Sequence, residues 1–224
     1  MLLPNAIKIG FYRRVFGYQI GQNVRIGFSY MDSDRLILGD EVRIGHLNRI
    51  TDIPEVTIGA CSNIGHRNTF VGSIEFTKPN ALAFRGNDPA LRVGEHCGIS
   101  GEHHFYVNDL LQIGDFTTIA GVGSVFYTHF VDVISGQQSC KPVRIGRYCM
   151  IGSSARFVPG SGVGDYTVVG MGSVVTKPQG KTHCLLGGNP AAFIRELSPE
   201  AAYFHRKTGW IGMFARAQPA PSSI

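Results

Sequence analysis

The chain lacks the features of a membrane-spanning or exported protein. No apolar stretch approaches the roughly 18 residues that a spanning helix needs. Residues 1–20 contain Arg13 and Arg14 among mixed residues, where a secretory signal would have an apolar core and a cleavage site. We therefore expect a soluble protein of the cytoplasm.

Cysteine pairs and clustered charge are also missing. The five cysteines are odd in number, widely spaced and without a C-x-x-C pair, which argues against a disulfide framework and a cysteine-rich zinc site. The net charge is +5, but basic residues never form a run of five, so we expect no nucleic-acid partner. The charge favours small anionic molecules at most.

Glycine, in contrast, is abundant and regularly placed, with 29 among 224 residues. From Ile145 the segments IGRYCM, IGSSAR, FVPGSG, VGDYTV and VGMGSV follow one another without a gap. The fifth position of this unit is small in most repeats, as at Cys97 and Cys149. The same unit recurs upstream, where it begins at Ile20, Ile26, Leu38, Ile44, Ile58, Ile64, Val93, Ile99, Ile113 and Ile119.

A period of six fits neither an α-helix nor a continuous strand, and it indicates a short strand followed by a corner. The aliphatic residue would point inward, and a glycine would allow the tight corner. Three such sides make a triangular coil of about 18 residues, and stacked coils pair as parallel strands. We predict one main domain of about seven to eight coils over residues 20–187, with loops around 76–92 and 127–144.

The N-terminal residues 1–19 predict a short capping helix. Ile7, Phe11 and Val15 recur at the spacing of one helix face. Such a helix would cover the open end of the prism, whose strand edges are otherwise unpaired. The alternative is a weak contact of this basic helix with an anionic membrane surface.

The C-terminal residues 188–224 predict a second helix and a flexible tail. Ser198 is a suitable N-cap and Pro199 suits the first helical position. This helix would cover the other end of the prism. The final AQPAPSSI segment is expected to be flexible.

The repeats, the segment THFVDVISGQQSCKPVRIG, the run VVGMGSVVTKPQG and the terminal LLGGNPAAFIRE resemble the hexapeptide-repeat acyltransferases. The resemblance covers about residues 20–196 and is to sugar O-acetyltransferases of the maltose, galactoside and colanic-acid type. It implies a left-handed parallel β-helix and a homotrimer with active sites between subunits. It also implies transfer of an acetyl group from acetyl-CoA to a sugar hydroxyl in polysaccharide or glycoconjugate synthesis.

Acyl transfer to an alcohol needs a general base, and histidine suits this role near neutral pH. His129 lies where the repeats give way to a loop. In the resembling enzymes a histidine in such a segment, followed by the K-P pair seen here at Lys141 and Pro142, is the catalytic base. His103 and His104 are rivals, because serine acetyltransferases of this fold place their base one coil earlier. Adjacent residues of a strand face opposite sides, so at most one of the two enters a cleft.

The resemblance also assigns binding residues. Coenzyme A would lie against backbone and basic groups of the later coils, at Gly152, Ser153, Gly170, Gly172, Lys177 and Arg195. The candidate acceptor-binding residues are Asn108, Asp109 and Asp132. Met150 and Ala192 depart from the pattern, because relatives often carry Trp and Arg there.

Other interpretations stay open. N-acetylation of an amino sugar or another small amine would use the same donor and fold. A metal-dependent hydratase needs three converging histidines, and neither His46 nor His66 has a second histidine five residues later, so we expect no metal. A non-catalytic β-helix scaffold is the third interpretation. Cys140 lies in the same loop as His129, but a covalent acyl-cysteine route would require its thiolate.

Overall fold

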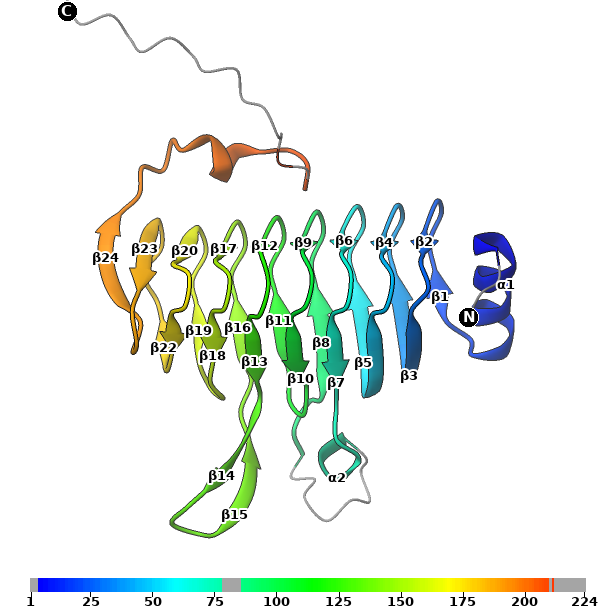
Figure 1. Cartoon of the computed structure of the whole chain (residues 1–224), viewed down its shortest axis with the longest axis horizontal. Helices are drawn as coiled ribbons and strands as arrows, with labels where there is room; N and C mark the ends of the chain where they lie inside the picture. Colours follow the sequence, from blue (N-terminus) through cyan, green and yellow to red (C-terminus); the bar gives the residue numbers. More distant parts are fainter. Residues whose placement is uncertain (1–3, 78–85, 210, 212–224) are drawn as a thin grey trace, which may run out of the picture.

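The protein is a rod of stacked strands with a helix at one end (Figure 1). A computed structural model describes residues 4–77, 86–209 and 211. Its strands form three long faces, on which successive strands pair in parallel until the last strand. This arrangement confirms the predicted stack of short parallel strands and is consistent with a left-handed β-helix.

The first two faces belong to one 13-stranded sheet. Two long strands bend from the first face to the second: β3 (Tyr30–Leu38) and β5 (Arg49–Ile58). The first face continues with β7 (Thr69–Val71), β10 (His104–Tyr106), β13 (Val125–Tyr127), β18 (Arg156–Phe157) and β21 (Val174–Val175). The second face contains β1 (Gln19–Ile20), β8 (Ala90–Val93), β11 (Leu111–Ile113), β16 (Val143–Ile145), β19 (Gly162–Val163) and β22 (Pro178–Gln179).

The third face is a nine-stranded sheet. Its strands are β2 (Arg25–Ile26), β4 (Arg43–Ile44), β6 (Asn63–Ile64), β9 (Gly98–Ile99), β12 (Thr118–Ile119), β17 (Met150–Ile151), β20 (Thr167–Val169), β23 (Cys184–Gly187) and β24 (Ala192–Glu196). Each aliphatic residue that begins a repeat on this face is buried, and Ile44, Ile64 and Ile99 are aligned by the strand register. The six-residue period therefore marks the inward positions, as predicted.

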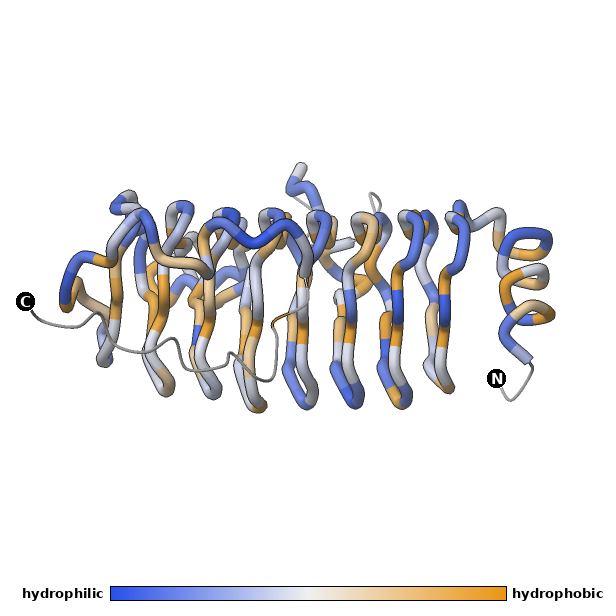
Figure 2. The backbone as a smooth tube through the Cα atoms, turned by 90° about the horizontal axis from the view of Figure 1, so that it is seen from above, coloured by the Kyte–Doolittle hydropathy of each residue, from blue (hydrophilic) through white to orange (hydrophobic). Residues whose placement is uncertain are grey.

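The interior is ordered by side chains that stack from coil to coil. Four phenylalanines, Phe70, Phe105, Phe126 and Phe157, form one continuous column with ring centroids 4.4 to 4.9 Å apart. Cys97 and Cys149 are buried at the small position of the repeat, as expected. Figure 2 shows that apolar and polar residues recur along each of the successive coils.

Three edges join the faces, and each carries its own residues. The asparagine edge, from the third face to the first, includes residues 45–48, 65–68, 100–103, 120–124, 152–155 and 170–173. The His129 edge, from the first face to the second, includes residues 72–77, 86–89, 107–110, 128–142, 158–161 and 176–177. The aromatic edge, from the second face to the third, holds the stacked rings of His96, Phe116, Tyr148, Tyr166 and His183.

The interruptions of the repeat both leave the rod at the His129 edge. Residues 127–144, predicted as a loop, form a hairpin of β14 (His129–Asp132) and β15 (Gln137–Cys140). The segment predicted around 76–92 begins with the short helix α2 (Ile74–Thr77), and part of it lies outside the described residues. Both excursions project from the same side of the rod (Figure 1).

The N-terminal helix α1 (Asn5–Val15) caps the first coil as predicted, but with a different face. Ile7, Phe11 and Val15 point to solvent, whereas Lys8 is only 4% exposed. The buried face pairs with backbone of the first coil: Lys8 Nζ donates to the carbonyls of Ile26 and Gly27 at 2.8 and 2.7 Å. Hydrogen bonding to the open strand edge, together with burial of Tyr12 in the core, therefore accounts for the orientation of α1.

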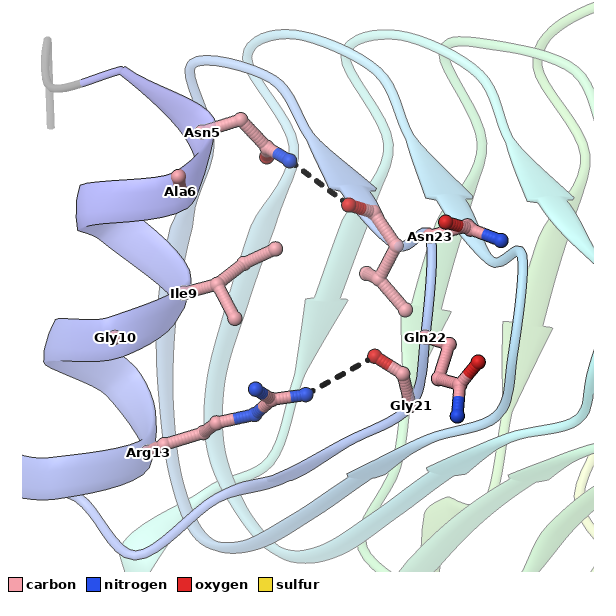
Figure 3. Close-up of a pocket in the computed structure, with 9 residues that line it drawn as sticks. Asn5, Ala6, Ile9, Gly10, Arg13, Gly21, Gln22 and Asn23 are labelled. Atoms are coloured by element: carbon pink, nitrogen blue, oxygen red, sulfur yellow. Dashed lines mark hydrogen bonds between the residues drawn. The ribbon is translucent and has the colours of Figure 1, made fainter.

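Figure 3 shows two more of these contacts, from Asn5 to the carbonyl of Val24 and from Arg13 to that of Gly21. The Asn5 side chain also accepts a hydrogen bond from the Ile26 amide at 2.9 Å. Polar side chains thus satisfy edge groups that would otherwise be unpaired. No described helix has the length and apolar character needed to cross a membrane.

The C-terminal prediction is corrected. No α-helix begins at Ser198 in the described residues; the chain there has a single 3-10 turn, Ala202–His205. The last strand, β24, instead pairs antiparallel with β23 and completes the edge of the third face. The chain then turns back along the coils, where the Tyr203 hydroxyl donates to the carbonyl of Cys149 at 2.8 Å (Figure 1). The predicted flexible tail lies outside the described residues.

Replacing Lys8 by methionine should lower the free energy of unfolding by about 1–3 kcal/mol, because the buried carbonyl of Ile26 loses its side-chain donor. Ile7→Ala, at the 57% exposed neighbouring position, should cost no more than about 0.5 kcal/mol. Chemical denaturation of both variants measures this difference. A larger loss for Ile7→Ala than for Lys8→Met would contradict the orientation of α1.

Candidate active site

His129 lies at the base of the hairpin, where the chain leaves the first face. Thr128, which is fully buried, anchors this point: its hydroxyl donates to the carbonyl of Tyr106 at 2.8 Å. The same oxygen accepts hydrogen bonds from the amides of Asn108 and Asp109 at 2.7 and 3.1 Å. Thr128 therefore ties the start of the hairpin to the preceding coil and fixes the position of His129.

Aromatic rings surround His129 on the rod side. Tyr106 and Tyr127 stack on each other, with centroids 4.7 Å apart, and both meet the imidazole edge to face. Phe76 of α2 lies 5.8 Å from the imidazole. This partial enclosure lowers the pKa of His129, because burial disfavours the imidazolium. The ring is therefore neutral at pH 7.

Asn108 is the hydrogen-bond partner of His129. Its Oδ1 accepts the backbone N–H of Ser73 at 2.6 Å, which leaves the amide Nδ2 to face His129 Nδ1 at 2.8 Å. Because Nδ2 is a donor, Nδ1 is the unprotonated nitrogen and the neutral ring carries its proton on Nε2. A donor at this position further disfavours protonation of the imidazole.

The two rival histidines, His103 and His104, have surroundings that differ from those of His129. His103 is fully buried inside the rod, where its Nδ1 accepts the amide of Ser124 at 3.1 Å, and burial lowers its pKa to about 4. Its place in the asparagine edge, where its own amide donates to Asn68, is that of a core residue. His104 is exposed on the first face, two residues before Tyr106 on the same strand. Only His129, among these three, lies against both Asn108 and the aromatic rings.

The two carboxylates near the hairpin accept hydrogen bonds from the chain around them. Asp109, only 9% exposed, accepts the amides of Leu110 and Asp88. Asp132 closes the hairpin turn by accepting the Ile134 amide and the Ser135 hydroxyl, at 3.0 and 2.9 Å, and these bonds lower its pKa.

Cys140 lies opposite His129 in the hairpin. Burial, followed by the nearby Asp109 carboxylate, raises the pKa of its thiol to about 12. A protonated thiol does not suit the acyl-cysteine route.

The residues predicted for coenzyme A do not gather in one place within the chain. Gly152, Ser153, Gly170 and Gly172 lie on the asparagine edge, where the Gly172 amide donates to the Ser153 carbonyl at 2.9 Å. Lys177 follows β21 on the His129 edge, and Arg195 lies in β24 on the third face. A single ligand that reaches both His129 and Gly152 would therefore have to contact two different edges.

A groove of about 430 Å³ begins beside the hairpin on the His129 edge and extends across the second face. Lys141, Arg144, Gly160, Gly162 and Pro178 are among the residues that line it. Its two cations suit an anionic ligand. Gly160 has a φ of 80°, and a side chain there would meet Lys141.

Sequence reasoning missed several site residues for identifiable reasons. Arg144 faces outward in an ordinary repeat, and Thr128 gains its role only from contacts with the preceding coil. Ser73 acts through its backbone, which no residue type signals. Gly72, just before Ser73, is a residue type that the sequence does show. A Cβ there would lie 2.0 Å from the carbonyl oxygen of Asp52, so only glycine fits at the point where the chain leaves the rod.

No group of three His, Cys, Asp or Glu side chains within the described part of the chain is placed to hold a metal ion. His46 and His66 are exposed on the asparagine edge and stack in parallel, with centroids 5.5 Å apart. Each accepts a backbone amide at Nδ1, from Phe28 and from His46 respectively. The three converging histidines of a hydratase site are therefore not found among these residues.

Solved structures share this fold, although no family model matches the sequence. A UDP-N-acetylglucosamine acyltransferase from Campylobacter jejuni is 17% identical over 80% of this chain and 71% of its own, with a TM-score of 0.56. A polysialic-acid-specific acetyltransferase is 20% identical over 80% and 81%, with a TM-score of 0.53. An N-acyltransferase from Bacillus cereus, solved with dTDP and coenzyme A, is 16% identical over 89% and 92%, with a TM-score of 0.52. The resemblance to acyltransferases seen in the sequence is thus confirmed for the fold.

Asn108→Asp should raise the pKa of His129, because the carboxylate can keep the Ser73 contact and accept a proton from Nδ1. Asn108→Ala, which only removes the donor, should give a smaller rise. NMR titration of the imidazole measures all three proteins, and its nitrogen shifts report the tautomer. Equal pKa values in the three would show that Asn108 does not control the protonation of His129.

Proposed function

We propose that this protein is a coenzyme-A-dependent acyltransferase that moves an acetyl group to a sugar hydroxyl, with His129 as general base. The observation that carries the proposal is a neutral, half-buried His129, held by Asn108, on the edge where both excursions leave the rod. Lys141 on this edge and Arg144 in the adjoining strand β16 line one groove, whose two cations suit an anionic group of a bound substrate.

The shared fold supports acyl transfer as the reaction class. The solved structures with this fold include acyltransferases and an acetyltransferase, and one of them holds coenzyme A. Acetyl as the acyl group and a sugar as acceptor follow from the sequence resemblance. Glycoconjugate or polysaccharide synthesis is the process in which such a product would be used.

The reaction needs one proton transfer to His129 and a second one from His129 to the leaving group. The acceptor oxygen attacks the thioester carbonyl carbon while His129 takes the hydroxyl proton. The C–S bond then breaks, and the imidazolium returns the proton to the departing thiolate. No covalent enzyme intermediate is required, and Cys140, whose thiol pKa burial raises, takes no part.

Asn108 sets the condition for this transfer. The unprotonated Nδ1 of His129 is occupied by the Asn108 amide, and Nε2 carries the proton. Proton uptake at Nδ1 requires the acceptor to displace that amide. Uptake at Nε2 requires the other tautomer, in which a rotated Asn108 gives up its Ser73 contact. By either route Asn108 controls when His129 can act.

A homotrimer is part of the proposal. His129 and the Gly152–Ser153 corner lie on different edges, so a second copy must bring the asparagine edge to the donor that His129 serves. The hairpin tip supports such a contact, because Val133 and Ile134 are 88% and 96% exposed. Apolar side chains this exposed suit coverage by a neighbouring subunit.

N-acylation of an amino sugar is the second candidate. It is favoured by the N-acyltransferase that shares this fold and was solved with dTDP and coenzyme A. A neutral histidine can act as the base for either acceptor, because it can take the proton of an ammonium or, during attack on the thioester, that of a hydroxyl. Comparing sugars that differ only in a hydroxyl or an amine at one carbon would distinguish the two reactions.

His129→Ala should lower the rate of thiol release from acetyl-CoA with a working acceptor by about 10²- to 10⁴-fold. The melting temperature should change little, because His129 is half-buried at the hairpin base. His205→Ala, an exposed histidine on the C-terminal segment, is the matched control. An unimpaired His129→Ala enzyme, or an equal loss in His104→Ala, would refute the assignment.

The pH dependence follows from the lowered pKa of His129. A base must be unprotonated, so activity should stay level at neutral pH and fall only as the pH drops through this lowered pKa. The acid limb of kcat/KM should therefore lie below the ordinary histidine value of about 6.5. An acid limb above that value would place the base in a different environment.

A further inference from the structure

The outward face of α1 is apolar and lies at the end of the rod. Ile7, Phe11 and Val15 are 57%, 38% and 60% exposed, because α1 turns its Lys8 and Tyr12 side toward the first coil. Figure 1 shows α1 lying beyond the first coil, so its outer side is the end surface of the molecule. The three residues that precede Pro4 in the sequence, Met-Leu-Leu, are apolar as well.

The same end carries positive charge in its sequence. Residues 1–31 contain Lys8, Arg13, Arg14 and Arg25, and their first acidic neighbour is Asp32. Lys8 is buried against backbone carbonyls and Arg13 donates to the carbonyls of Ile20 and Gly21, whereas Arg14 in the last turn of α1 is exposed. The apolar face of α1 is therefore bordered by Arg14 and by no carboxylate from its own helix.

We propose that this outer face of α1, defined by Ile7, Phe11, Arg14 and Val15, docks on an anionic lipid surface. Apolar side chains would enter the headgroup boundary while Arg14 meets the lipid phosphates. A second copy of the chain fits less well, since two such faces would bring Arg14 against Arg14 without an opposing acid. The proposal does not depend on the enzymatic activity, and it would hold the open end of the rod against the membrane.

The test uses vesicles of phosphatidylcholine and phosphatidylglycerol in a three-to-one ratio, with pure phosphatidylcholine vesicles as the reference. The full chain should sediment with the anionic vesicles and remain largely in solution with the neutral ones. The double variant Ile7→Ser with Val15→Ser should lower the bound fraction at least about fivefold. Ile194→Ser is the matched control, because Ile194 is also 57% exposed and lies in β24 at the opposite end of the rod.

Charge and self-association are tested separately. Arg14→Glu, and addition of about 0.5 M sodium chloride to the native chain, should each weaken sedimentation. Thermal melting should show all variants folded, since the altered side chains are exposed. Sedimentation that is absent, independent of lipid charge, or equal in the Ile7/Val15 and Ile194 variants would overturn the proposal. A change in native mass with the Ile7/Val15 variant would likewise overturn it, by assigning the face to a second copy.

Discussion

Parallel hydrogen bonding between coils holds each corner directly over its counterpart in the next coil. The Gly27, Gly45 and Gly65 amides, for example, donate to the isoleucine carbonyls at the equivalent position one coil on. Side chains must then stack in register, which explains the phenylalanine column and the Asn48–Asn68–His103 series inside the rod. An extra segment can be accommodated only where it leaves the stack entirely. The His129 edge is where both excursions do so, and the candidate site is built from them.

This constraint separates histidines that look alike in the sequence. His103 replaces an asparagine in a buried series, where its ring accepts a backbone amide and loses contact with solvent. His129 stands just outside the stack, on a hairpin that Thr128 holds to the coil beneath. Burial by the aromatic rings and the Asn108 donor both favour its neutral form. The imidazole of His129 gains these surroundings from two excursions and one regular coil acting together.

The repeat period was sufficient to predict the strands, their inward residues and the two interruptions, because each depends on local spacing. The orientation of α1 was not predictable from the Ile7, Phe11 and Val15 stripe, since the opposite side both bonds the carbonyls of the first coil through Lys8 and packs Tyr12 into the core. Ser198 and Pro199 carry the capping signals of a helix, but the chain there forms only a 3-10 turn after β24 has paired with the edge strand β23. Asn108 was named from its position, but its link to His129 required the backbone of Ser73, which has no sequence signature.

The central claim is that a working site combines the His129 edge of one copy with the asparagine edge of another. Co-expression of His129→Ala with Ser153→Glu, whose larger side chain would block the predicted contact of the donor with the asparagine edge, tests it most directly. Each variant alone should be inactive, and the mixed assembly should recover thiol release at those sites that pair two unaltered edges. Two folded, individually inactive variants that form mixed assemblies without recovering any activity would contradict the claim.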